Sequence, residues 1–263
     1  MDQAAAWLVG EVKNKYGVDL SKDKIALQRL KTANLGAINN DLTVFLVAWL
    51  TAAENTDKGL GVLSAMAPRR QQAGEQAAVQ ALILMTAARD DKAGEAFEQA
   101  RRLPLASPDL IASMEARLLA SRGDFSGAQK VIASEIEEHG HGSATDYAFG
   151  LLGSGQPVPR PKLSLRQGAA LIIYLASAGG IARTSPELAA LRYSLALQLD
   201  PDLAPARLRF ADAFEQQDRA EDAIEVLQEI NANSPWRAEA LIQQAWLLNL
   251  LDRPGEALVA ADQ

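Results

Sequence analysis

The chain contains no cysteine and only two histidines. Disulfides, thiolate zinc sites and cysteine nucleophiles are therefore excluded. Both histidines, His139 and His141, lie in the stretch "EEHGHG", whose composition is typical of a helix end rather than of a metal site. A hydroxyl nucleophile would need a base held against it, and no motif of that kind is present. We therefore expect no catalytic residue, no cofactor and no metal, and we do not expect an enzyme.

The chain also lacks a long hydrophobic run near its start. Asp2 and Glu11 leave only a short apolar patch between them, which fits neither a signal peptide nor a membrane span. We expect no membrane insertion by this segment. The sequence leaves the compartment open between the cytoplasm and, if a leader has been removed, the periplasm.

Basic residues are scarce towards the C-terminus. The formal net charge is −7, and from Ser185 onward acidic residues outnumber basic ones by more than two to one. Binding to a phosphate backbone needs clustered lysine and arginine. The charge pattern therefore excludes nucleic acid as the expected partner.

Aromatic residues make up only 5% of the chain, whereas alanine and leucine are abundant. Alanine and leucine are strong helix formers, while aromatic and β-branched residues favour strands. The composition therefore predicts an all-α fold.

Small residues recur every 34 residues in the C-terminal part of the chain. The small positions are Ala189, Ala223 and Ala257. Larger residues follow the first two four positions later, at Tyr193 and Leu227. A proline closes each of these two units, at Pro201 and Pro235. Ala211 holds a small position in the helix that precedes one of these units. A small residue is needed where two antiparallel helices cross closely, because a larger side chain would push them apart.

This pattern resembles the tetratricopeptide repeat, a 34-residue helix–turn–helix unit with small and aromatic positions and a closing proline. The resemblance covers residues 167–263, with one residue too many between positions 175 and 189. The sequence is also similar in style to long bacterial tetratricopeptide proteins of undefined role. The resemblance implies a right-handed superhelical α-solenoid of antiparallel helix hairpins.

The same interval continues upstream in a looser form. Ala128, Ala93 and Gly59 mark it at spacings of 35 and 34 residues, and a further helix is expected over residues 22–33. We therefore expect a degenerate block of tetratricopeptide-like hairpins over residues 1–153, a proline-rich connector over 154–162, and a repeat block over 163–263 whose last repeat is truncated.

Three prolines within five residues exclude a helix in the connector; they are Pro157, Pro159 and Pro161. The connector is then either an extended joint between two helical blocks or a surface loop within one continuous solenoid.

Three tryptophans have expected packing roles. Trp7 and Trp49 fall on apolar helix faces and are expected in the core. Trp236 follows Pro235 directly and is expected to pack between repeats.

By the resemblance, the first helices of neighbouring repeats line a concave groove that holds a peptide or a helix. The groove positions in this sequence are Leu208, Asp212, Glu215, Ile242, Trp246, Asn249 and Leu250. The basic residues with which co-chaperone tetratricopeptide domains grip a C-terminal carboxylate are absent from these positions. Instead, Ile242, Trp246 and Leu250 form an apolar stripe near Asp212 and Glu215, which an apolar helix with basic flanks would complement. The alternative is that Trp246 and Leu250 pack against a following repeat or a second copy of the chain.

The sequence therefore predicts a non-enzymatic scaffold that binds a protein or peptide partner in its groove. Two alternatives remain: a regulatory or targeting arm of a larger multidomain enzyme, and a self-assembly module that forms a homo-oligomer through its uncapped C-terminal end. After Ala257 the repeat requires a fuller helix than the sequence holds. We therefore expect that the chain continues beyond Gln263 or that its last apolar face is uncapped.

Overall fold

The computed structural model describes residues 40–65, 72–179, 182 and 184–262. The helix expected over residues 22–33 and Trp7 lie outside these ranges. Within them the chain forms thirteen helices and no strand, so the all-α prediction is confirmed. None of these described helices has the length and apolar character needed to cross a membrane. The helices are α3 (Asn40–Glu54), α4 (Thr56–Ser64), α5 (Ala73–Thr86), α6 (Asp90–Arg101), α7 (Pro108–Ser121), α8 (Phe125–His139), α9 (Ser143–Gly153), α10 (Leu165–Ala178), α12 (Pro186–Leu199), α13 (Ala204–Glu215), α14 (Ala220–Gln228), α15 (Arg237–Leu250) and α16 (Pro254–Ala261).

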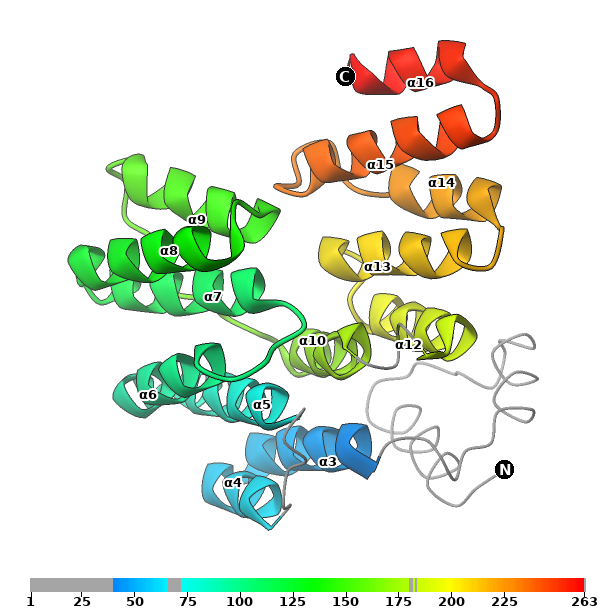
Figure 1. The fold of residues 1–263 in the computed structure, drawn as a ribbon. Coiled ribbons are helices and arrows are strands. Elements are labelled where there is room, and N and C mark those ends of the chain that lie inside the picture. Colours follow the sequence, from blue (N-terminus) through cyan, green and yellow to red (C-terminus); the bar gives the residue numbers. More distant parts are fainter. Residues whose placement is uncertain (1–39, 66–71, 180–181, 183, 263) are drawn as a thin grey trace.

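Helices that follow each other along the chain pack as hairpins (Figure 1). The closest pairs are α3 with α4, α5 with α6, α7 with α8, α10 with α12, α13 with α14, and α15 with α16. Each hairpin also packs against a neighbour, as α6 does against α7 and α14 against α15. The fold is therefore built from helix pairs whose apolar sides face one another.

Four of the hairpin turns share one backbone geometry. The residues with a positive φ just after the first helix are Ala88 (55°), Gly123 (88°), Asp218 (57°) and Asp252 (58°). In each turn the next residue donates its N–H to the carbonyl five positions back, as Arg219 does to Phe214 at 3.0 Å. Together with the bond from the positive-φ residue itself, this is a Schellman motif, which satisfies the last carbonyls of a helix. Asp218 and Asp252 stand 34 residues apart, which is the interval of the sequence repeat.

The small residues of the repeat lie inside the hairpins. Residues with 0% exposure include Ala93, Ala128, Ala189, Tyr193, Ala211, Ala223 and Leu227. At Gly59 an added Cβ would lie 2.4 Å from the Cβ of Ala52, so the close approach of α4 to α3 depends on glycine. Pro201 is exposed and Pro235 half-buried, each in a turn between two hairpins, while Ala257 is half-buried in α16.

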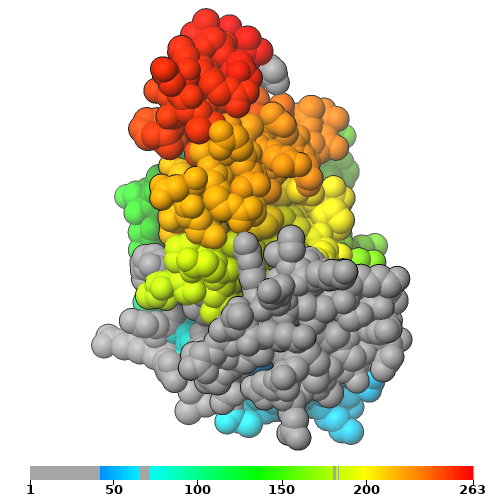
Figure 2. Space-filling view, turned by 90° about the vertical axis from the view of Figure 1, so that its right-hand side faces the viewer, coloured from blue at the N-terminus to red at the C-terminus, as the bar shows by residue number. Residues whose placement is uncertain are grey.

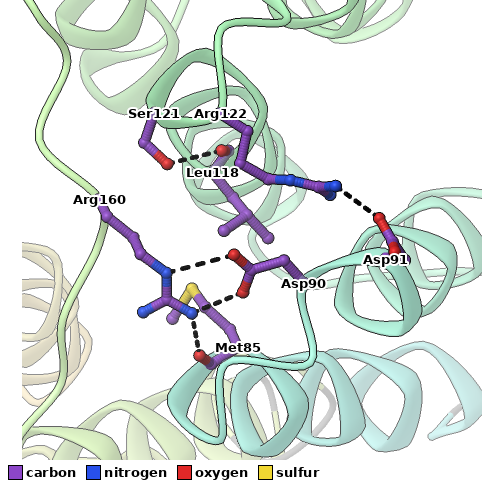
Figure 3. Close-up of polar contacts among 7 residues, drawn as sticks. All are labelled: Met85, Asp90, Asp91, Leu118, Ser121, Arg122 and Arg160. Atoms are coloured by element: carbon purple, nitrogen blue, oxygen red, sulfur yellow. Dashed lines mark hydrogen bonds and ion pairs between the residues drawn. The ribbon is translucent and has the colours of Figure 1, made fainter.

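The stack of hairpins is interrupted after α9. Residues 154–164 contain no helix, and side chains of this segment contact the preceding helices. Val158 is buried in the apolar core of α7, α8 and α9. Arg160 reaches the α5–α6 turn, where it pairs with Asp90 at 2.6 Å and donates to the carbonyl of Met85 (Figure 3). The helix that follows, α10, packs against α3 and α5.

Trp49 of α3 secures this return of the chain. Its indole N–H donates to the carbonyl of Leu165 at 2.9 Å, and its ring lies against Gly168 of α10. Trp49 is 3% exposed, so its expected place in the core is confirmed. The largest apolar core contains residues of α3 to α7 together with residues of α10, α12 and α13. This core therefore extends across the connector.

Two arms rise from this joint, as Figure 1 shows. We call α5 to α9 the first arm and α12 to α16 the second arm. In the second arm the helices are stacked in the order of the sequence, from α12 near the base to α16 at the tip (Figure 2). Because α10 packs beside α3 and not beside α9, the hairpins do not form a single uninterrupted stack.

Candidate functional site

Polar side chains join the first arm to α10 and to the second arm. Ser107, directly before α7, shares a hydrogen bond of 2.7 Å with the hydroxyl of Tyr174 in α10. Ser143 at the start of α9 donates to Glu239 at the start of α15, also at 2.7 Å. The second contact joins the two arms directly, at the N-terminal ends of α9 and α15.

Asp109 of α7 is partly buried at the same junction. Burial raises the pKa of its carboxyl, and the backbone N–H groups of Leu110 and Ala144 and the charge of Arg209 in α13 oppose that shift. The carboxylate therefore lies at the N-terminal ends of α7 and α9, where the helix dipole favours an anion. The burial that raises the pKa of Tyr174 is likewise opposed by Ser107 and Arg209.

Polar contacts also join α13 to α15 within the second arm. Asp212 of α13 pairs with Arg209 at 2.9 Å and accepts a hydrogen bond from Gln243 of α15 at 2.6 Å. About one turn further along both helices, Glu215 accepts a hydrogen bond from the indole of Trp246 at 3.3 Å. The two helices therefore present these side chains on one common face, which we call the α13–α15 face.

An uncovered apolar stripe runs along α15 on this face. Ile242, Trp246 and Leu250 follow each other at intervals of four residues and are 72, 61 and 61% exposed. Residues four apart lie one above the other on a helix, so the three side chains form a continuous row. Leu258 and Val259 of the adjoining helix α16 are also more than half exposed. Grouped apolar side chains on a surface mark sites of interaction.

The remaining predicted groove residues have different surroundings. Leu208 is 5% exposed in the apolar core of the second arm, so it supports the α13–α15 face from below and is not part of the surface. Asp212 and Glu215 are half-buried, and Asn249 is exposed. Trp236 is half-buried against the core of the second arm.

Sequence reasoning missed Leu258 and Val259. They lie in α16, which has only eight residues. Two turns of helix are too short for the spacing of apolar residues to indicate which of them are buried.

The cations of the second arm are largely neutralised by neighbouring carboxylates. The ion pairs are Arg207 with Glu229, Arg209 with Asp212, Arg219 with Asp222, and Arg253 with Glu256. Glu215 and Glu239, which flank the stripe, accept hydrogen bonds from the neutral groups of Trp246 and Ser143. The surface around the stripe therefore carries a net negative charge.

Both histidines lie in the first arm. His139, in the last turn of α8, is 3.0 Å from Glu135, and the exposed His141 is 2.6 Å from Asp146. In the part of the chain that the structure describes, no three histidine, aspartate or glutamate side chains gather as metal ligands. Each imidazole therefore has one carboxylate beside it.

Three strongly buried charges lie outside the α13–α15 face. Burial raises the pKa of Glu75 in α5 to about 7 and lowers that of Arg192 in α12 to about 10. Burial also raises the pKa of Glu115 in α7, and Arg101 of α6, which pairs with it at 2.6 Å, opposes the shift. Because these groups are enclosed by the packed helices, they bear on stability rather than on binding.

No model of a known protein family matches the chain. The α13–α15 face combines an exposed apolar row with neighbouring carboxylates.

Proposed function

We propose that the chain is a non-enzymatic interaction scaffold that binds a protein or peptide partner on the α13–α15 face. The observation that carries this proposal is the row of Ile242, Trp246 and Leu250, each more than 60% exposed. Burying such side chains against a partner would contribute about 25 cal/mol for each Å² of apolar surface removed from water. Large aromatic residues of this kind commonly anchor interfaces.

We further propose that both arms consist of tetratricopeptide-like hairpins. Two features support this: the Schellman turns recur at the repeat interval, as at Asp218 and Asp252, and small residues such as Ala189 and Ala223 are fully buried within the hairpins. In such an array α13 and α15 are first helices of adjacent repeats. Their common face is then the surface on which stacked hairpins hold extended or helical ligands.

Site-specific photo-crosslinking in native cells tests the binding function. A benzophenone amino acid replaces Trp246 in the full chain, and the adducts formed on irradiation are identified by mass spectrometry. The matched control places the same group at Phe149 in α9, a side chain of the first arm that is 64% exposed. Both positions carry an exposed aromatic residue, so only their place on the molecule differs.

We expect a discrete adduct from position 246 that is absent from position 149. The adduct should disappear when Ile242 and Leu250 are both replaced by serine, while the thermal unfolding midpoint should change little because both side chains are exposed. No adduct at position 246, or the same set of adducts from both positions, would refute the proposed binding function.

A further inference from the structure

We infer that the occupant of the α13–α15 face is an amphipathic helix with lysine or arginine on its polar side. This inference rests on the proposed function and specifies the chemistry of the partner. The stripe from Ile242 to Leu250 spans about 12 Å along the helix axis at 1.5 Å per residue. Two to three turns of a partner helix, with apolar residues three and four apart, cover that length.

The charges around the stripe favour a positively charged partner. Glu239 lies one turn before Ile242, and Glu215 contacts the indole of Trp246. Four arginines of the same arm already have carboxylates beside them, for example Arg209 with Asp212 at 2.9 Å and Arg253 with Glu256. A partner that brings cations to Glu215 and Glu239 therefore gains attraction beside the apolar row.

The same charges disfavour a second copy of this chain as the occupant. Two copies docked through their stripes would bring the carboxylates of one second arm against those of the other, and like charges at an interface are repulsive. An anionic lipid surface is disfavoured for the same reason. A basic helix satisfies both the apolar row and its acidic borders.

A panel of three fluorescent peptides tests this inference with the full 263-residue chain. The first is an amphipathic helix of about 18 residues, five turns, made of leucine and lysine. The second has glutamate in place of each lysine. The third has the composition of the first in an order that gives no apolar face. Fluorescence anisotropy at low and moderate salt reports binding.

We expect the leucine–lysine helix to bind at least tenfold more tightly than the other two peptides. Its affinity should fall as salt is raised, because part of the attraction is between charges. Replacing both Glu215 and Glu239 by glutamine should reduce the salt dependence. Replacing Trp246 and Leu250 by alanine should weaken binding at least tenfold, whereas the control Phe149→Ala, at another exposed aromatic residue, should leave it unchanged.

Three results would overturn the inference. The first is that the glutamate peptide binds as tightly as the lysine peptide. The second is that the Trp246→Ala, Leu250→Ala variant binds the lysine peptide with full affinity. The third is that the mass measured by sedimentation doubles as the unmodified chain is concentrated, whereas the variant keeps the mass of one chain. The photo-crosslinking experiment shows whether only the basic-helix inference has failed or the proposed binding function has failed as well. A specific adduct at position 246 with an acidic segment or with a second copy would keep the function and refute only the basic helix.

Discussion

Replacing Gly168 by alanine tests the contact that brings α10 back to α3. Gly168 lies within α10 and faces the indole of Trp49. The indole N–H of Trp49 donates to the carbonyl of Leu165, which is 116 residues further along the chain. An alanine in a helix interior is normally more stable than glycine by about 1 kcal/mol. At this position the local preference and the tertiary contact act in opposite directions.

The size of the effect follows from the geometry. A Cβ on residue 168 would lie 1.8 Å from Cζ2 of Trp49, whereas ordinary contact begins at 3.4 Å, so the ring must retreat by about 1.6 Å. The indole is 3% exposed and its N–H bond to Leu165 holds it in place. Overpacking of a core costs about 1–3 kcal/mol, so after the helix preference is subtracted we expect a net loss of up to about 2 kcal/mol.

Urea unfolding followed by circular dichroism measures this loss. The matched control is Gly150→Ala in α9, where an added Cβ meets nothing within 4 Å. The control should be as stable as the unmodified chain or up to about 1 kcal/mol more stable. If Gly168→Ala were stabilised as much as Gly150→Ala, α10 would not pack against Trp49 and the two arms would not share a joint.

Three further substitutions probe other parts of the fold. Ala88→Gly should stabilise the chain by about 1 kcal/mol, because alanine is strained at a φ of 55° and glycine is not; an unchanged urea midpoint would contradict this. For Glu75, the folded pKa of about 7 exceeds the ordinary 4.5, so the unfolded state ionises first as pH rises from 4.5 to 7. The folded chain loses up to about 3 kcal/mol over that window, a loss that Glu75→Gln avoids. That variant should therefore match the unmodified chain in urea at pH 4 and exceed it at pH 8, and equal midpoints at both pH values would refute the assignment. Arg101→Met leaves the buried Glu115 without its partner and should cost about 3–5 kcal/mol at neutral pH. A shift in thermal unfolding worth less than about 1 kcal/mol would show that this pair is not enclosed.

The sequence predicted those parts of the fold that depend on nearby residues. The paired stretches "DRAED" and "DRPGE" mark the turns at Asp218 and Asp252, whose backbone geometry is the same. The three connector prolines correctly excluded a helix. The return of α10 to α3 could not be predicted, because Trp49 and Gly168 meet only in the folded chain and neither residue has a sequence neighbour that indicates the contact.

The candidate site shows a similar limit. The spacing of Ile242, Trp246 and Leu250 placed them on one side of a helix, and the structure leaves that side uncovered. The resemblance to the repeat put Leu208 in the groove, although it is 5% exposed, because a repeat position does not show which neighbouring helix covers a residue. The hydrogen bond between Ser143 and Glu239 depends on how the two arms are placed, and no local pattern encodes it.

The most direct test of the central claim is fluorine NMR of the full chain labelled with 5-fluorotryptophan. The signal of Trp246 is assigned by its loss in Trp246→Phe, and the leucine–lysine helix is then titrated into the labelled chain. The account predicts that the Trp246 signal shifts or broadens in proportion to binding while that of the buried Trp49 stays in place. A Trp246 signal that is unchanged at saturating peptide would contradict the claim that the α13–α15 face is the binding surface.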